Sequence, residues 1–247
     1  MITAMLFAGG VGRRMKEAEM PKQFLNVAGK PIIIRTMMHF ENHPAVDDIV
    51  IACKEDWIDY LNDLIAKYDI KKVRAVIPGG ETGYQSIHNG VLETAKVATN
   101  PDDIILICDG VRPMLSEELI TNCIEATKKY GTAVPVTPSI DSLLYSEDGE
   151  TCGKSYKRSS MYITQAPQGY TMEKILWAHS EAEKRGITNP VSSSELFIEL
   201  GHDVHLFIGE RTNIKVTTPE DMDFLRASFF YKHFKKFAQE EFDRNDI

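Results

Sequence analysis

A glycine-rich run followed by cationic side chains is the strongest chemical signal in this sequence. An apolar segment leads into Ala8-Gly9-Gly10-Val11-Gly12-Arg13-Arg14-Met15, and shortly afterwards comes Pro21-Lys22-Gln23. Glycines in such a turn let backbone N–H groups approach a phosphate chain closely. The two arginines and the lysine suit the charge of a triphosphate and the charge that develops on a phosphorus atom under attack. The run therefore predicts a loop that binds a nucleoside triphosphate.

Two better-known phosphate loops do not fit this run. It lacks the G-x-G-x-x-G fingerprint of a dinucleotide site, which also counts against a dinucleotide-dependent oxidoreductase, and no G-K-[ST] of a Walker A loop follows it. A tight turn with solvated arginines is the structural alternative, because a glycine-rich turn alone is a weak signal. The Pro-Lys-Gln that follows makes the functional interpretation the stronger one.

The elements that must position this loop alternate along the chain. Helical spacing is present at 31–41, Trp57–Tyr68, Gln85–Thr99, Glu117–Tyr130, 171–185 and Thr218–Phe237. Apolar segments of strand length lie at Ile2–Ala8, Asp48–Cys53, Val73–Ile77, Ile104–Cys108, Thr132–Val136 and Val204–Ile208. This alternation predicts an α/β fold with a mostly parallel sheet and helices on both of its faces. Ligands of such sheets bind beyond the carboxyl ends of the strands, where chemically active loops are expected at 8–22, 78–86 and 108–113.

One segment departs from this alternation. Residues 139–164 are polar and contain the turn signal Ser-Glu-Asp-Gly-Glu between two extended stretches. We expect a protruding β-arm here, either as a decorative loop or as a dimerisation arm or lid. The rest of residues 1–247 is expected to form one domain around the sheet.

The composition restricts the class of protein. The 247 residues are 43% hydrophobic and 26% charged, as in an ordinary globular protein, and the four cysteines form no Cys-x-x-Cys pair. The formal net charge of −8 argues against a nucleic-acid polymer as partner, although a local cationic pocket for a small anion is compatible with it. The chain has no run of about 18 apolar residues and no signal-peptide pattern, so we expect no membrane partner and a cytoplasmic location.

Three ordered motifs resemble those of a family of cytidylyltransferases that act on 2-C-methylerythritol 4-phosphate and on ribitol 5-phosphate, over about residues 2–227. The first loop matches, with one extra residue between Met15 and Pro21, at Gly10, Gly12, Arg14, Met15, Pro21, Lys22 and Gln23. The family's His-Asp-x-x-Arg-Pro motif is matched by Cys108-Asp109-Gly110-Val111-Arg112-Pro113. Its late Gly-x-x-x-Asn-Ile-Lys-x-Thr-x-x-Asp motif is matched at Gly209, Asn213, Ile214, Lys215, Thr217 and Asp221.

The resemblance implies a Rossmann-like nucleotidyltransferase sheet and a Mg²⁺-dependent reaction of CTP with a polyol phosphate, which gives a CDP-polyol and pyrophosphate. The acceptor is already a phosphate anion, so the reaction needs fixed cations and Mg²⁺ rather than a strong general base. By the resemblance, Arg14 and Lys22 bind the CTP phosphates, and Lys215 is a third cation at the α-phosphate. Asp109 is the expected Mg²⁺ ligand, because Mg²⁺ prefers oxygen ligands. Arg112 either acts in catalysis or pairs with a carboxylate.

The resemblance also implies which residues contact the nucleotide. They come from the first loop, from a Gly-Gly-x-x-Arg-x-x-Ser motif and from the His-Asp motif, and they are Ala8, Gly9, Gly10, Gly12, Gly80, Ser86 and Asp109. Gly83 stands where the second of these motifs has arginine, which removes a cation from the loop and weakens the inference that CTP is the only nucleotide. Ser86 is also suited to cap the N-terminus of the following helix.

Departures from the family pattern cluster on the acceptor side. Ser142 keeps a hydroxyl where the family has threonine, and Arg158 matches an arginine that binds the acceptor's phosphate, often across a dimer interface. Ala166 replaces a threonine. Thr212 stands where an acidic residue often precedes Asn-Ile-Lys, and Glu210 is a hypothetical second Mg²⁺ ligand in its place. The intact CTP side and the altered acceptor side predict an active enzyme with a changed acceptor.

Ribitol 5-phosphate, or a related polyol or sugar phosphate, is the acceptor that we expect. Val111 before Arg112, and Gly-Glu-x-x-Asn-Ile-Lys at 209–215, resemble the ribitol-phosphate branch more closely. Two alternatives stay open: a 2-C-methylerythritol 4-phosphate cytidylyltransferase of isoprenoid synthesis, and a non-catalytic paralogue that binds nucleotide. The retained cations count against the paralogue, since a binding module does not need all of them. The expected partners are CTP, the small phosphate acceptor and a second copy of the chain bound through the arm at 139–164.

Overall fold

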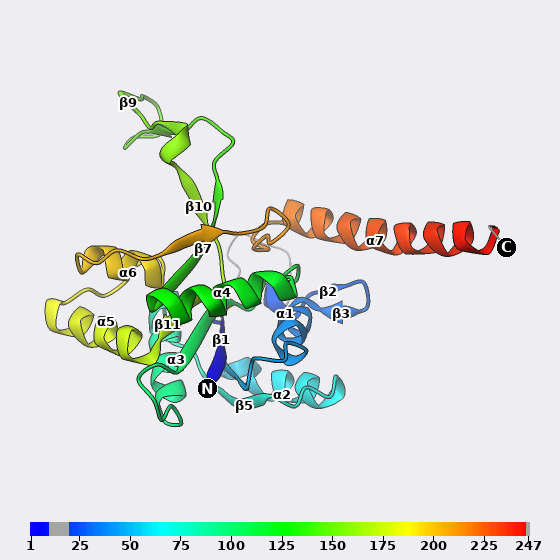
Figure 1. Cartoon of the computed structure of the whole chain (residues 1–247), viewed down its shortest axis with the longest axis horizontal. Helices are drawn as coiled ribbons and strands as arrows, with labels where there is room; N and C mark the ends of the chain where they lie inside the picture. Colours follow the sequence, from blue (N-terminus) through cyan, green and yellow to red (C-terminus); the bar gives the residue numbers. More distant parts are fainter. Residues whose placement is uncertain (10–19, 246–247) are drawn as a thin grey trace.

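The computed structural model describes residues 1–9 and 20–245, with side chains as far as Tyr231 and at positions 234 and 235. Within these ranges, helices and strands alternate around one large sheet, and a narrow arm and the C-terminal helix project from it (Figure 1). The α/β fold that the sequence predicts is therefore confirmed.

Four parallel strands form the centre of the sheet and bring the predicted loops to one edge. β1 (Ile2–Ala8) lies between β4 (Asp48–Cys53) and β6 (Ile104–Asp109), and β5 (Val73–Pro78) pairs with the other side of β4. The strands end at the same level, because Ala8 pairs with Cys53, Cys53 with Pro78, and Phe7 with Asp109. The loops that follow β1, β5 and β6 therefore start side by side, as expected for an open parallel sheet.

The other half of the sheet has mixed strand directions. β11 (Gln168–Thr171) lies antiparallel between β6 and β7 (Thr132–Pro138), and β7 also pairs with β10 (Tyr162–Thr164), antiparallel, and β12 (Leu206–Ile208), parallel. The sequence does not predict β11, because four residues are too few to show an alternating pattern. Gly169 lets this strand lie against α4, since a Cβ there would be 2.0 Å from Thr127 Oγ1.

The helices cover both faces of the sheet. They are α1 (Ile32–Glu41), α2 (Ile58–Lys67), α3 (Gly83–Ala95), α4 (Glu117–Tyr130), α5 (Met172–Arg185) and α6 (Ser193–Glu199), whereas α7 (Pro219–Asn245) projects away from the sheet (Figure 1). Successive strand residues point to opposite faces, so Leu6 packs into one core with α1, α2 and α4 while Met5 packs into another with α3, α5 and α6. The predicted helix Glu117–Tyr130 is confirmed at both ends, whereas α3 starts before its predicted first residue and α7 continues past Phe237.

The segment 139–164 forms the predicted arm. It contains the short hairpin of β8 (Leu144–Tyr145) and β9 (Lys154–Ser155) and a 3₁₀ turn at Arg158–Ser160 before it returns to the sheet as β10. Its side chains are mostly exposed, and the arm projects away from the helices on both faces (Figure 1). No helix in the described ranges is long and apolar enough to cross a membrane.

Candidate active site

Lys22 is held at the carboxyl end of β1 by its neighbours in the Pro-Lys-Gln motif. It begins a 3₁₀ turn, Lys22–Phe24, in which Phe24 N–H donates to the Pro21 carbonyl at 2.9 Å. The buried side chain of Gln23 donates from Nε2 to the Ala8 carbonyl at 2.7 Å, and Phe24 stacks on Trp57. The motif therefore fixes the backbone of Lys22 beside the last residue of β1. Three predicted site residues of the same loop, Gly10, Gly12 and Arg14, lie outside the described residues.

Asp109, Arg112 and Lys215 form an ion-pair cluster at the end of β6. One carboxylate oxygen of Asp109 accepts from Arg112 Nε at 2.8 Å, and the other is 2.6 Å from Lys215 Nζ. Asp109 and Arg112 are buried, while the side chain of Lys215 is 45% exposed. The structure thus brings together two of the predicted site residues that are far apart in the sequence, and it shows the carboxylate pairing that the sequence left open for Arg112.

The charges of this cluster keep the carboxyl group ionised. Burial opposes the ionisation of Asp109, but the guanidinium of Arg112 and the ammonium group of Lys215 outweigh burial and lower its pKa. At neutral pH the cluster therefore contains one carboxylate and two cations. Hard oxygen anions of this kind bind Mg²⁺, which commonly keeps waters and takes its other ligands from substrate phosphates.

A second layer of hydrogen bonds joins the two motifs that supply the cluster. Arg112 Nη1 donates to the Asn213 carbonyl at 3.0 Å, and Val216 N–H donates to the Val111 carbonyl at 3.0 Å. The buried side chain of Asn213 donates to the Ala166 carbonyl at 2.7 Å. These bonds fix the segment 209–217 against the loop after β6, so that Lys215 faces Asp109.

The loop between β5 and α3 is organised around Ser86. Its buried hydroxyl accepts from Gly80 N–H at 3.0 Å and donates to the Thr82 carbonyl at 3.0 Å. The N-cap of α3 is Thr82, in a capping box with Gln85, so the N-cap role considered for Ser86 is wrong. The hydroxyl is also near the first loop, because a Cβ on Gly9 would lie 2.9 Å from Ser86 Oγ. The structure thus brings Gly9, Gly80 and Ser86 together.

Replacing Ser86 with alanine tests the role of this loop in nucleotide binding. We expect the free energy of unfolding to fall by about 1–2 kcal/mol, because the Gly80 N–H loses its partner in a half-buried place. The KM for CTP should rise severalfold at the same time. The matched control is Ser192→Ala, which removes the N-cap of α6 and should lower stability without changing that KM. An unchanged KM for CTP in Ser86→Ala would show that this loop does not contribute to nucleotide binding.

A cavity of about 560 Å³ opens beside Lys215, between the base of the arm and the segment 209–217. It is lined by Arg112, Thr137, Pro138, Ile140, Asp141, Ile163, Thr164, Gln165, Arg211, Asn213, Ile214, Lys215 and Asp221. The predicted acceptor residues Ser142 and Arg158 are not in this lining. Both are exposed on the arm, where Arg158 Nη1 donates to the Ile140 carbonyl at 3.4 Å. Arg211 is a cavity residue that the sequence reasoning missed, although its position shortly before Asn-Ile-Lys was a usable signal.

Glu210 faces α4 in this structure. Its carboxylate accepts a hydrogen bond from Ser116 Oγ, the N-cap of that helix, and its backbone makes two hydrogen bonds with the side chain of Gln165. Among the residues that the structure describes, no three His, Cys, Asp or Glu side chains are grouped to hold a metal ion.

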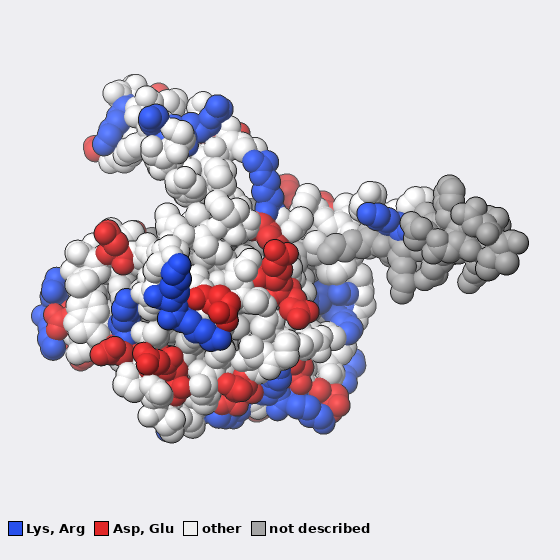
Figure 2. All heavy atoms as spheres, in the orientation of Figure 1, with Lys and Arg blue, Asp and Glu red and all other residues white. Residues whose placement is uncertain are grey.

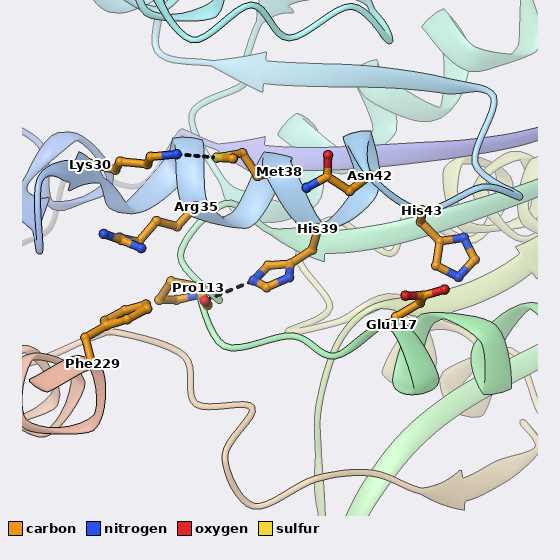
Figure 3. A pocket seen from close by; sticks show the side chains of 9 residues that line it. All are labelled: Lys30, Arg35, Met38, His39, Asn42, His43, Pro113, Glu117 and Phe229. Carbon is orange, nitrogen blue, oxygen red and sulfur yellow. Dashed lines mark hydrogen bonds between the residues drawn. The ribbon is translucent and has the colours of Figure 1, made fainter. Parts of the chain in front are cut away.

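A second pocket, of about 310 Å³, lies between α1, the loop after Arg112 and α7 (Figure 3). Its side chains bind other parts of the protein. Arg35 donates to the carbonyls of Val27 and Ala28 and lies over the Phe229 ring, with Cζ 4.1 Å from the ring centroid. His39 Nε2 is 3.0 Å from the Pro113 carbonyl. The contact between His39 and Pro113 therefore ties the loop after Arg112 to α1.

The surface shows no single extended basic face from the side drawn in Figure 2. Basic side chains lie on the arm, and acidic and basic side chains are interspersed over the body.

Comparisons with known proteins identify the family of the chain. The family profile described as "IspD: 2-C-methyl-D-erythritol 4-phosphate cytidylyltransferase" matches residues 2–233. A ribitol-5-phosphate cytidylyltransferase of Vibrio parahaemolyticus is 40% identical over 227 residues, which cover 92% of this chain and 95% of that relative. A 2-C-methyl-D-erythritol 4-phosphate cytidylyltransferase of Clostridium acetobutylicum is 37% identical over 224 residues, which cover 90% and 94%.

A solved structure supports the same assignment of the fold. The crystal structure of 4-diphosphocytidyl-2C-methyl-D-erythritol synthase from Anaerococcus prevotii matches with a TM-score of 0.77 and 27% identity, over 92% of this chain and 95% of that one. The predicted nucleotidyltransferase sheet is thereby confirmed. The profile match covers nearly the whole chain and includes both motifs that meet at Asp109. This protein therefore belongs to the IspD family of cytidylyltransferases.

Proposed function

We propose that this enzyme transfers the cytidylyl group of CTP to ribitol 5-phosphate and releases pyrophosphate. The observation that carries the proposal is the cluster of Asp109, Arg112 and Lys215 beside an open cavity, in a chain that is 40% identical to a ribitol-5-phosphate cytidylyltransferase. The cluster supplies charge for a phosphorus centre, and the cavity provides room for the second substrate.

In the proposed reaction, a phosphate oxygen of the acceptor attacks the α-phosphorus of CTP. The new P–O bond forms as the bond between the α-phosphorus and the bridging oxygen breaks, and that electron pair leaves with pyrophosphate. The attacking oxygen is already anionic, so no side chain has to remove a proton. Lys22, and Arg14 from the first loop, would bind the triphosphate, and Lys215 would stabilise charge on the α-phosphate.

Asp109 is the residue that would hold Mg²⁺. The fit rests on its donor chemistry, since its pKa is lowered and its carboxylate is ionised at neutral pH at the end of β6. Bound there, Mg²⁺ would supply Lewis-acid stabilisation of the phosphate oxygens. Lys215, which is half exposed, has room to turn from Asp109 toward the α-phosphate when the ion binds.

The arm supports a proposal of a homodimer. Leu143, Leu144, Tyr145 and Tyr156 are exposed on it, and a second copy of the chain would cover them. Because Arg158 lies outside the cavity of its own chain, its predicted contact with acceptor phosphate would be made in the cavity of the partner.

A pyrophosphate-release assay with CTP, Mg²⁺ and a panel of acceptors tests the proposed function. We expect the highest kcat/KM with ribitol 5-phosphate and a much lower value with 2-C-methyl-D-erythritol 4-phosphate. The second compound is the alternative acceptor, because the family profile and the relative at 37% identity carry its name. A higher kcat/KM with 2-C-methyl-D-erythritol 4-phosphate would make that compound, rather than ribitol 5-phosphate, the proposed acceptor. Release with no acceptor of the panel would favour a non-catalytic nucleotide-binding protein.

A further inference from the structure

The cavity beside Lys215 contains a cation that no other part of the site uses. Of its three basic side chains, Arg112 is paired with Asp109 and with the Asn213 carbonyl, and Lys215 is paired with Asp109. Arg211 is exposed and lines the same cavity. Within the described part of the chain, its guanidinium makes no ion pair or hydrogen bond. A guanidinium with its donors free is suited to bidentate binding of a phosphate.

The base of the arm contributes a carboxylate to the same cavity. Asp141, one of the first residues of the arm, is exposed there, and its side chain has no hydrogen bond or ion pair with the described residues. Its neighbours in the lining include the exposed apolar side chains of Ile140 and Ile163. The cavity thus combines an unpaired cation, an unpaired carboxylate and an apolar wall.

We propose that Arg211 binds the phosphate of the acceptor and that Asp141 accepts hydrogen bonds from its hydroxyl groups. This inference rests on the proposed function and names the residues that select the acceptor. The acceptor's phosphate has to reach the α-phosphorus near Lys215, and Arg211 lies on the same short segment as Lys215. The cluster of Asp109, Arg112 and Lys215 has a net charge of only +1, from two cations and one carboxylate. The acceptor brings a second dianionic phosphate into the site, and Arg211 would bind it from within the chain, alongside the partner subunit's Arg158.

The proposal also states a class of substrate. A carboxylate at the hydroxyl end of the cavity accepts hydrogen bonds from a polyol chain but repels a second phosphate there. The site therefore selects polyol monophosphates over polyol bisphosphates of the same length. Arg158 of the same chain does not take this role, because it lies outside the cavity lining and donates to the Ile140 carbonyl.

The test compares KM values for the two substrates in Arg211→Gln, which keeps much of the side-chain length and removes the charge. We expect the KM for ribitol 5-phosphate to rise about 10- to 100-fold, as for the loss of a charged hydrogen-bonding partner. The KM for CTP should stay unchanged, and Arg211→Lys should recover part of the loss. Asp141→Asn should raise the KM for ribitol 5-phosphate and reduce the discrimination against ribitol 1,5-bisphosphate. Arg226→Gln, an exposed position on α7, is the matched control.

Calorimetric titration of ribitol 5-phosphate into the wild-type protein and Arg211→Gln separates this proposal from the proposed function. An inactive wild-type protein that still binds ribitol 5-phosphate through Arg211 would contradict only the reaction. An active wild-type enzyme whose Arg211→Gln variant keeps a normal acceptor KM would overturn the role of Arg211. Equal rises of both KM values would also overturn it, because they would indicate a general electrostatic effect rather than an acceptor site.

Discussion

Replacing Asp109 with asparagine is expected to lower kcat by about 1,000-fold or more. Asparagine keeps the shape of the side chain but removes the charge that would hold Mg²⁺. A metal ion acting as a Lewis acid contributes several kcal/mol, and each 1.4 kcal/mol corresponds to a factor of ten in rate. The measurement is pyrophosphate release at saturating CTP and acceptor over a series of Mg²⁺ concentrations. The variant should also lose its response to Mg²⁺.

The folded state of this variant has to be checked separately. Asp109→Asn leaves the buried guanidinium of Arg112 without its carboxylate, and breaking a buried ion pair in this way typically costs about 3–5 kcal/mol. The double variant Asp109→Asn with Arg112→Gln removes both charges and should recover much of the stability. It should remain inactive if Asp109 holds the metal ion. Recovery of turnover in the double variant would show that Asp109 serves only as the partner of Arg112.

A second control uses a carboxylate at the other end of the sheet. Asp48 starts β4 and is 3.5 Å from Arg74, in an ion pair that is more exposed than that of Asp109. Asp48→Asn removes the same charge from the protein without touching the carboxyl ends of the strands. Its turnover should equal that of the wild type. A comparable loss in this variant would attribute the effect of Asp109→Asn to the fold.

The central sheet could be predicted from sequence because three of its four parallel strands are almost entirely apolar runs. Ile2–Ala8, Asp48–Cys53 and Ile104–Asp109 are largely buried on both faces, so apolar residues dominate them and Thr3 is the one polar residue inside these three runs. Because helices alternate with these strands, the strands run parallel, and the loops that follow them are expected at the same edge of the sheet. β11 shows the opposite case, because its four residues include glycine and its strand character depends on pairing with β6 and β7.

The contacts within the site could be predicted only in part. The motifs indicated that Asp109 and Lys215 serve the same reaction, and the structure shows their ion pair. Local spacing did not show that Thr82 rather than Ser86 caps α3, since both residues can accept from a backbone N–H. The surroundings of Arg211 could not be predicted from sequence either, because its cavity is also lined by residues at the base of the arm, which are far from Arg211 in the chain.

The position of Lys22 is determined by contacts of its neighbours that cannot be read from the sequence motif. Gln23 is buried and ties the turn to the end of β1, and Phe24 packs against Trp57. The residues on the C-terminal side of Lys22 therefore anchor the turn and fix the backbone of Lys22 at the strand ends. Substitution of Gln23 should consequently impair the same step as substitution of Lys22, through position rather than charge.

Replacing Lys22 with alanine is expected to lower turnover about 100-fold or more, as does the loss of other fixed groups that stabilise a transition state. Lys22 lies at the carboxyl end of β1, beside the loop that should bind the triphosphate, and its charge matters most as negative charge shifts toward the leaving pyrophosphate. The loss should therefore appear in kcat as well as in the KM for CTP. Single-turnover measurements at saturating CTP would separate the two effects.

The controls for Lys22→Ala follow from its surroundings. Lys22→Arg keeps the charge and should retain more activity than alanine, while Lys71→Ala removes an exposed lysine that pairs with Asp69 and should have no effect. Thermal stability should be similar in all three variants, because the anchoring side chains of Gln23 and Phe24 are unchanged. Near-normal kcat in Lys22→Ala would show that Lys22 does not act in the chemical step. A rise in the KM for CTP alone would instead indicate that Lys22 binds the ground state and transition state equally, since uniform binding leaves kcat unchanged.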